Sequence, residues 1–84
     1  MQHSMQYRKY LPRVRVQSSA VRSIGYDEHE WVLQVRFNSG KLYNYFRVPP
    51  QEHDALVRAA SIGDYLNRQI KPYYEYEELE TAEA

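Results

Sequence analysis

Large apolar side chains occupy alternate positions in the middle of the chain. Every second residue from Trp31 to Phe37 is large and apolar, and a second run, rich in aromatic residues, extends from Lys41 to Val48. A period of two is typical of strands with one buried face, and the intervening Asn-Ser-Gly is typical of a turn. The pattern therefore predicts a hairpin with strands over 31–37 and 41–48.

The register of this hairpin decides where its tyrosines point. If residues 38–40 form a type I turn with a left-handed glycine bulge, Phe37 pairs with Lys41, and Tyr43 and Tyr45 line the apolar face. Glycine at the third loop position favours this register. If only the last two of these residues form the loop, the tyrosines lie on the exposed face instead, because a slip of one residue exchanges the faces.

Weaker strand signals flank the hairpin. Over residues 13–16 valine alternates with arginine, which predicts a short half-buried strand with a basic outer face. Residues 20–26 are rich enough in Val and Ile to form a second strand or a bent continuation of the first, and 27–30 are a polar connection. Residues 73–76 could add a short edge strand near the end of the chain.

Two short helices are predicted after the hairpin. Two prolines at 49–50 end the strand and begin a helix, because proline suits the first helical turn. Its apolar stripe is expected at His53, Leu56, Val57 and Ala60. A capping-box-like run at 61–64 begins a second helix, which ends at Lys71-Pro72 and whose apolar side is expected at Ile62, Tyr65, Leu66 and Ile70. The predicted fold is α+β: an antiparallel three- to four-stranded meander with two short helices packed on one face.

Composition limits the class of protein. A chain of 84 residues supports one core, and without cysteine it has neither a disulfide nor a thiolate zinc site. The large side chains are mostly aromatic, with nine Tyr, two Phe and one Trp. No apolar run is long enough for a signal peptide or a membrane span, so we expect a cytoplasmic protein.

Charge is unevenly distributed although the formal net charge is zero. Residues 1–26 contain no acid, and residues 74–84 contain no base. We therefore predict a flexible basic arm over 1–12, one domain over 13–76 and an acidic disordered tail over 77–84.

Several short runs fit one family pattern: Ser18-Ser19-Ala20-Val21, Ile24-Gly25-Tyr26-Asp27, Val35-Arg36-Phe37, Gly40, Tyr43-Asn44-Tyr45-Phe46, Val48-Pro49, Ala60-Ser61, Gly63, Tyr65, Asn67, Ile70 and Tyr74. Together these runs resemble the KTSC domain. This resemblance covers about residues 14–76 and implies the α+β fold. The family takes its name from the C-terminal extension of some lysyl-tRNA synthetases and also includes small free-standing bacterial proteins, with a suggested role in RNA binding. Asp64 and Leu66 depart from the family pattern, which expects a base and Phe there.

Cations and flat rings are interleaved in the second half of the chain. RNA-binding modules need cations for phosphates and aromatic faces for bases, and each stacked base contributes about 1–3 kcal/mol. The alternative for the tyrosines of the hairpin is that they are core rings with hydroxyls at the rim, which the bulged register favours. The predicted nucleic-acid-binding residues are Arg36, Lys41, Tyr43, Tyr45, Arg47, Arg68 and Lys71.

Other classes of function have weaker support. A sheet with an unpaired edge could instead accept a strand from a protein partner, and the neutral net charge favours this alternative. Catalysis has little support because His3, His29 and His53 each stand alone, and no nucleophile motif is present. We expect no enzyme activity and no cofactor, metal or membrane partner.

Overall fold

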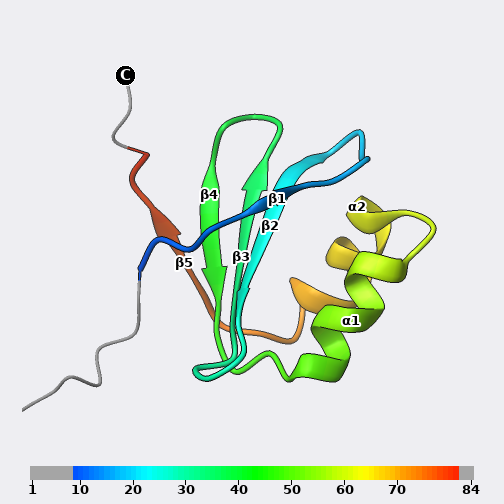
Figure 1. The fold of residues 1–84 in the computed structure, drawn as a ribbon. Helices are drawn as coiled ribbons and strands as arrows, with labels where there is room; N and C mark the ends of the chain where they lie inside the picture. The colour runs from blue at the N-terminus through cyan, green and yellow to red at the C-terminus, as the bar shows by residue number, and fades with distance from the viewer. Residues whose placement is uncertain (1–8, 82–84) are drawn as a thin grey trace, which may run out of the picture.

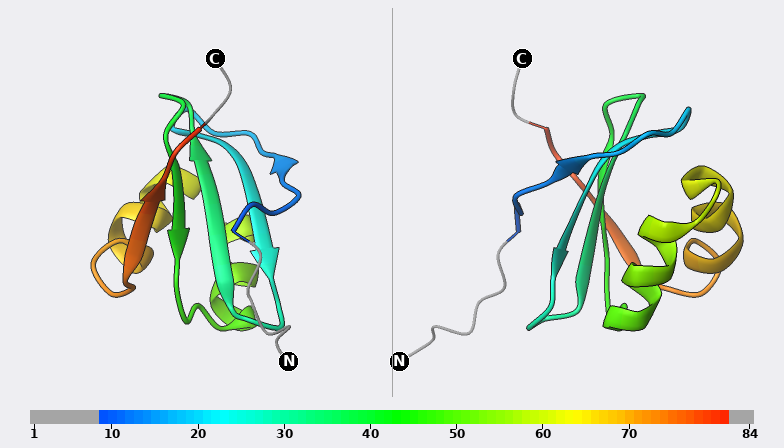
Figure 2. Two further views of the ribbon diagram at one scale, coloured as in Figure 1. Left: turned by 90° about the vertical axis from the view of Figure 1, so that its left-hand side faces the viewer. Right: turned by 45° about the vertical axis from the view of Figure 1, so that its right-hand side comes forward.

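Five antiparallel strands follow one another as a meander in a computed structural model, which describes residues 9–81 (Figure 1). The helical elements all lie on one face of the sheet (Figures 1 and 2). The predicted α+β class is confirmed, although the sheet has five strands rather than three or four. The elements are β1 (Val14–Arg15), β2 (Val21–Asp27), β3 (Val32–Phe37), β4 (Leu42–Tyr45), α1 (Pro50–Arg58), α2 (Ile62–Tyr65), the π-helix η1 (Leu66–Ile70) and β5 (Tyr76–Leu79).

The turn between β3 and β4 has the predicted bulged register. The Phe37 amide donates to the Lys41 carbonyl at 2.9 Å, and Gly40 is left-handed with a φ of 100°. Tyr43 lies opposite Val35 in the sheet, and Tyr45 lies opposite Leu33. Side chains alternate along a strand, so both tyrosines face the helices.

The helices cover the inner face of the sheet, but α1 contributes less to the core than its pattern predicts. Leu56 is the buried residue of α1, whereas Val57 is 39% exposed and Ala60 lies beyond the end of the helix. Consecutive helical residues point about 100° apart, so Leu56 and Val57 cannot both face the sheet. The second helix agrees better: the Ser61 hydroxyl accepts from the Asp64 amide at 3.2 Å, and Ile62, Leu66 and Ile70 are buried.

A short N-terminal strap, residues 9–13, crosses the outer face of the sheet, opposite the helices (Figure 2). Beneath it Gln34 and Asn44 are fully buried, and the Gln34 side-chain nitrogen donates a hydrogen bond to the Asn44 side-chain oxygen at 2.7 Å. The side-chain amide nitrogen of Gln34 also donates to the Lys9 backbone carbonyl at 2.6 Å, and the side-chain oxygen of Gln34 accepts from the Leu11 backbone amide at 3.1 Å. The strap therefore satisfies a polar pair that would otherwise be buried without sufficient partners.

This packing reverses the predicted pattern at residues 13 and 14, whereas Arg15 is exposed and Val16 packs against the core as predicted. Val14 is 72% exposed, whereas the Arg13 guanidinium turns inward and donates to the Gln34 side-chain oxygen at 2.5 Å. The buried amide oxygen provides an acceptor for Arg13, which alternation alone could not indicate. Residues 9–12 of the predicted flexible arm are packed, and residues 1–8 lie outside the described residues.

Three strand boundaries also differ from the prediction. Trp31 is 44% exposed and left-handed, with a φ of 60°, so it belongs to the turn before β3. A left-handed Arg47, with a φ of 62°, follows β4 and ends that strand early. β5 continues to Leu79, so residues 77–79 are not a disordered tail; Leu79 pairs with Leu42 and is buried on the outer face. Residues 82–84 lie outside the described residues.

Among residues 9–81, no helix is long and apolar enough to cross a membrane.

Replacing Gly25 by alanine should release the strap. A Cβ at Gly25 would lie 2.5 Å from the Pro12 carbonyl oxygen, so strap or strand must move. We expect Gly25→Ala to lower the free energy of unfolding by about 1–3 kcal/mol, as overpacking does, in urea denaturation. Gly63→Ala is the control, because its methyl would meet two side-chain atoms and no backbone, the Ala20 Cβ at 3.1 Å and the Ser18 hydroxyl oxygen at 3.9 Å, in a helical segment that favours alanine. Equal stability of Gly25→Ala and the wild type would contradict close packing of the strap.

Candidate functional site

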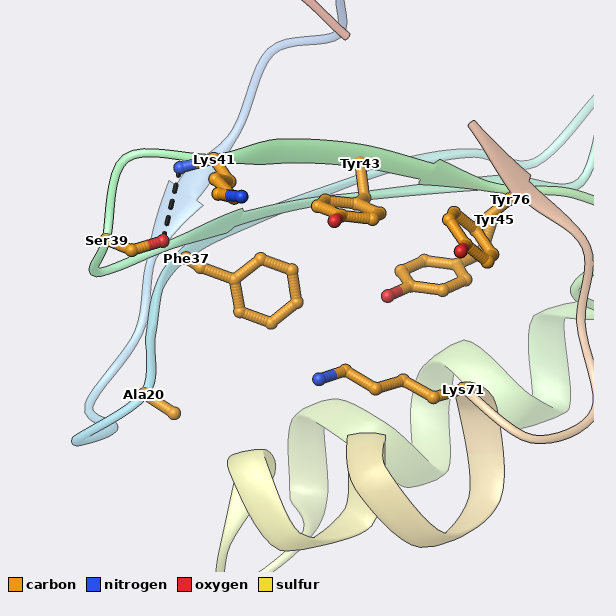
Figure 3. Close-up of a pocket in the computed structure, with 8 residues that line it drawn as sticks. All are labelled: Ala20, Phe37, Ser39, Lys41, Tyr43, Tyr45, Lys71 and Tyr76. Carbon is orange, nitrogen blue, oxygen red and sulfur yellow. Dashed lines mark hydrogen bonds between the residues drawn. The ribbon is translucent and has the colours of Figure 1, made fainter. Parts of the chain in front are cut away.

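A cavity of about 590 Å³ opens between the inner face of the sheet and the end of η1 (Figure 3). β3, β4 and β5 form one wall, and Lys71 extends into the space from the helical layer. The cavity therefore combines segments that are far apart in the sequence. Its lining residues are Ala20, Phe37, Ser39, Lys41, Tyr43, Tyr45, Lys71 and Tyr76.

Four aromatic rings pack together along the sheet wall. The ring centroids of Tyr43 and Tyr45 are 6.1 Å apart and nearly parallel, and Tyr76 lies 5.4 Å from Tyr43 and 6.0 Å from Tyr45. Phe37 contacts Tyr43 edge-on at 5.6 Å. These spacings are typical of favourable aromatic pairs, so the rings form a pre-organised surface.

The tyrosines of this cluster differ in exposure. Tyr45 is 2% exposed and belongs to the core, Tyr43 is half-buried, and Tyr76 is 59% exposed. Burial, reinforced by neighbouring Tyr43 and Tyr76, raises the pKa of Tyr45 well above its usual value, so its hydroxyl stays protonated. The Tyr43 hydroxyl donates to a Glu78 carboxylate oxygen at 3.4 Å. Tyr45 is thus a core ring and a cavity wall at once, whereas Tyr76 is open to a stacking partner.

Two lysines bring positive charge to the cavity. The Lys71 ammonium lies 5.1 Å from the centroid of the Phe37 ring, and Lys41 lies on the sheet side (Figure 3). The π-helical turn that places Lys71 closes with its amide donating to the Leu66 carbonyl at 2.9 Å; such turns are frequent at functional sites. Within residues 9–81, neither ammonium has a carboxylate within ion-pair distance.

The three predicted arginines do not join this cavity. Arg36 belongs to the outer-face set of β3 and donates to the Gly40 carbonyl at 3.1 Å. Arg47 pairs with Glu75 at 3.5 Å, and Arg68 pairs with Asp64 at 3.3 Å, all with exposed side chains. Of the predicted set, the structure therefore brings together Lys41, Tyr43, Tyr45 and Lys71.

Sequence reasoning did not assign Phe37, Ser39 and Tyr76 to the site. The bulged register places Phe37 beside Tyr43 on the inner face, so Phe37 could have been assigned to the site from the predicted register. Tyr76 joins only because β5 pairs with β4 and sets it opposite Tyr45. No local pattern predicts which strand a terminal segment joins.

Apart from the cavity, a cluster of polar side chains links the helices on the inner face. The Glu52 carboxylate accepts from the hydroxyls of Tyr65, at 2.5 Å, and Tyr74, at 3.3 Å. The hydrogen bond to Glu52, followed by burial, raises the pKa of Tyr65 to about 12. This arrangement joins α1 to α2 and to the segment before β5. In the described part of the chain, no group of three or more His, Cys, Asp or Glu side chains could hold a metal ion.

The chain is therefore a small α+β domain in which an antiparallel sheet carries helices on one face and an aromatic cavity beneath them. A model of the KTSC domain matches residues 17–74, so the chain belongs to the KTSC domain family. The membership predicted from the sequence is confirmed.

Relatives occur both as small proteins and as parts of larger ones. The chain is 46% identical over 67 residues to an uncharacterized protein from Stutzerimonas stutzeri, covering 79% of this chain and 94% of that protein. It is 32% identical over 69 residues to a lysine–tRNA ligase from Nostoc punctiforme, covering 82% of this chain but 12% of the ligase. The crystal structure of a KTSC domain protein from Yersinia pestis is 30% identical and superposes with a TM-score of 0.81, covering 84% of this chain and all of that one.

Stability should fall at high pH as the bonded tyrosines ionise. Folding raises the pKa values of Tyr26 and Tyr65 to about 12 from an ordinary 10.0. The stabilisation of the folded state that accompanies this shift is therefore complete below about pH 10 and is lost between about pH 10 and 12. Urea denaturation across this range should show the fall, and Tyr65→Phe, which cannot ionise there, should make it shallower. The same pH dependence in the wild type and the variant would contradict this assignment.

Proposed function

We propose that this domain is a non-catalytic RNA-binding module that uses the cavity between the sheet and η1. The observation that carries the proposal is the convergence of two cations without carboxylate partners, Lys41 and Lys71, on a cluster of aromatic rings. Cations attract phosphates, and ring faces accept bases without strong sequence preference. Binding is expected to be weak and sensitive to salt, because few charges take part.

The kinship with lysine–tRNA ligases supports an RNA partner. A region similar to most of this chain occurs within ligases whose name refers to tRNA. A domain that assists such an enzyme needs affinity for RNA but no chemistry of its own. A cytoplasmic location and a bacterial origin belong to the same proposal, since the relatives from Stutzerimonas stutzeri, Nostoc punctiforme and Yersinia pestis are bacterial.

A protein-binding role through a sheet edge is the alternative. β1 is an edge strand of two residues, and its Val14 is largely exposed. Edge strands can accept a partner strand through main-chain hydrogen bonds, which depend little on salt. Salt dependence therefore separates the two candidates.

RNA binding should depend on the lysines of the cavity. Fluorescence anisotropy of a labelled single-stranded RNA and a tRNA-like hairpin, at low and near-physiological salt, should show binding that weakens steeply with salt. Lys41→Ala or Lys71→Ala should weaken binding and reduce the salt slope by about one each.

Arg58→Ala is the control matched for charge. Arg58 is exposed on α1, where it pairs with Asp54 at 3.1 Å, away from the cavity lining. The control should keep the affinity of the wild type. Absence of binding at low salt, or equal losses in the control and the lysine variants, would count against RNA binding through the cavity.

A further inference from the structure

The hydroxyl of Tyr45 lacks a hydrogen-bond partner among residues 9–81, although its side chain is almost fully buried. Other partly buried tyrosines have partners: the Tyr26 hydroxyl donates to the Val48 carbonyl at 2.6 Å, and Tyr65 and Tyr74 donate to Glu52. Buried polar groups are rarely left unpaired, because an unpaired group loses its hydration without replacement. Tyr45 lines the cavity, so its missing partner is expected there.

The polar groups around the cavity define the charge of that partner. Lys41 and Lys71 present ammonium groups, which only donate hydrogen bonds, and the hydroxyls of Ser39 and Tyr45 can donate as well. Tyr45 remains protonated because burial raises its pKa. Donors and positive charge together require a ligand that accepts and is negative, which a phosphate satisfies.

The shape and the rings define the rest of the ligand. A volume of about 590 Å³ lies within the range of about 300–1,000 Å³ found for pockets that hold drug-sized molecules. The exposed Tyr76 ring and the Phe37 ring offer flat apolar surface beside the charged groups (Figure 3). A space of this size between two layers suits one inserted base better than a continuous strand or a duplex.

We propose that this cavity binds a single nucleoside monophosphate unit, either free or as one unpaired nucleotide of an RNA. The base lies against Tyr76 and Phe37, and the phosphate accepts hydrogen bonds from the Tyr45 hydroxyl and the two ammonium groups. This inference rests on the proposed function and specifies the unit that is recognised. It assigns the Tyr45 hydroxyl the role of a hydrogen-bond donor to the phosphate, in addition to the place of the ring in the core.

The test is an NMR titration of the full chain with adenosine monophosphate, adenosine and inorganic phosphate. Adenosine monophosphate should cause saturable chemical-shift changes in the backbone amides of the cavity residues. Adenosine alone and inorganic phosphate alone should each bind more weakly. Tyr45→Phe should weaken binding of the monophosphate by about tenfold, as expected for a lost hydrogen bond to a charged group.

Thermal unfolding without ligand distinguishes binding from folding. Tyr45→Phe removes an unpaired hydroxyl and should leave the unfolding midpoint unchanged or higher. Tyr26→Phe is the matched control: it leaves the Val48 carbonyl without its donor and should lower the midpoint, while affinity for the monophosphate stays that of the wild type. A Tyr45→Phe variant with full affinity would overturn the inference.

Competition separates this inference from the proposed function. RNA displaced by adenosine monophosphate supports both. RNA that binds but is not displaced at saturating monophosphate overturns the single-nucleotide site and leaves RNA binding intact. Binding of the monophosphate without binding of RNA at low salt supports the site, identifies a free nucleotide as its ligand and refutes the RNA-binding function.

Discussion

The pairing register of β3 with β4 is the constraint on which both faces of this domain depend. The left-handed Gly40 and the pairing of Phe37 with Lys41 set Tyr43 and Tyr45 inward and Gln34 and Asn44 outward. A slip of one residue would expose the tyrosines and bury two amides in an apolar core, where each unpaired group costs several kcal/mol. The cavity and the strap therefore follow from one turn.

Each face is covered by different means. The inner face has the apolar core under the helices, and the outer face has the strap over a pair of bonded amides with Leu11, Leu42 and Leu79 buried nearby. β5 serves both, because Tyr76 faces the cavity and Leu79 faces outward. A chain of this size buries a modest fraction of its surface, so covering both faces contributes much of its stability.

A net charge of zero conceals a local excess of positive charge. Arg47, Arg58 and Arg68 each pair with a nearby carboxylate at the surface, whereas Lys41 and Lys71 face the cavity without such a partner within residues 9–81. Surface ion pairs contribute little to stability, and they leave the lysines as the cations available at the rings. The net charge therefore does not describe the charge at the cavity, which depends on which cations have carboxylate partners.

The sequence by itself determined the α+β class, the central hairpin with its bulged turn, the Ser61 cap and the family, because these depend on local period, turn chemistry and short motifs. It also predicted one site of basic and aromatic residues, of which only Lys41, Tyr43, Tyr45 and Lys71 lie together. Only the tertiary structure decided that Arg13 turns inward to Gln34, that residues 76–79 form a fifth strand, and that Tyr76 completes the cavity while Arg36, Arg47 and Arg68 stay outside. The inward Arg13 and the pairing of β5 depend on contacts between residues 21 to more than 30 positions apart, where partners are chosen by competition for buried donors and acceptors rather than by any local pattern.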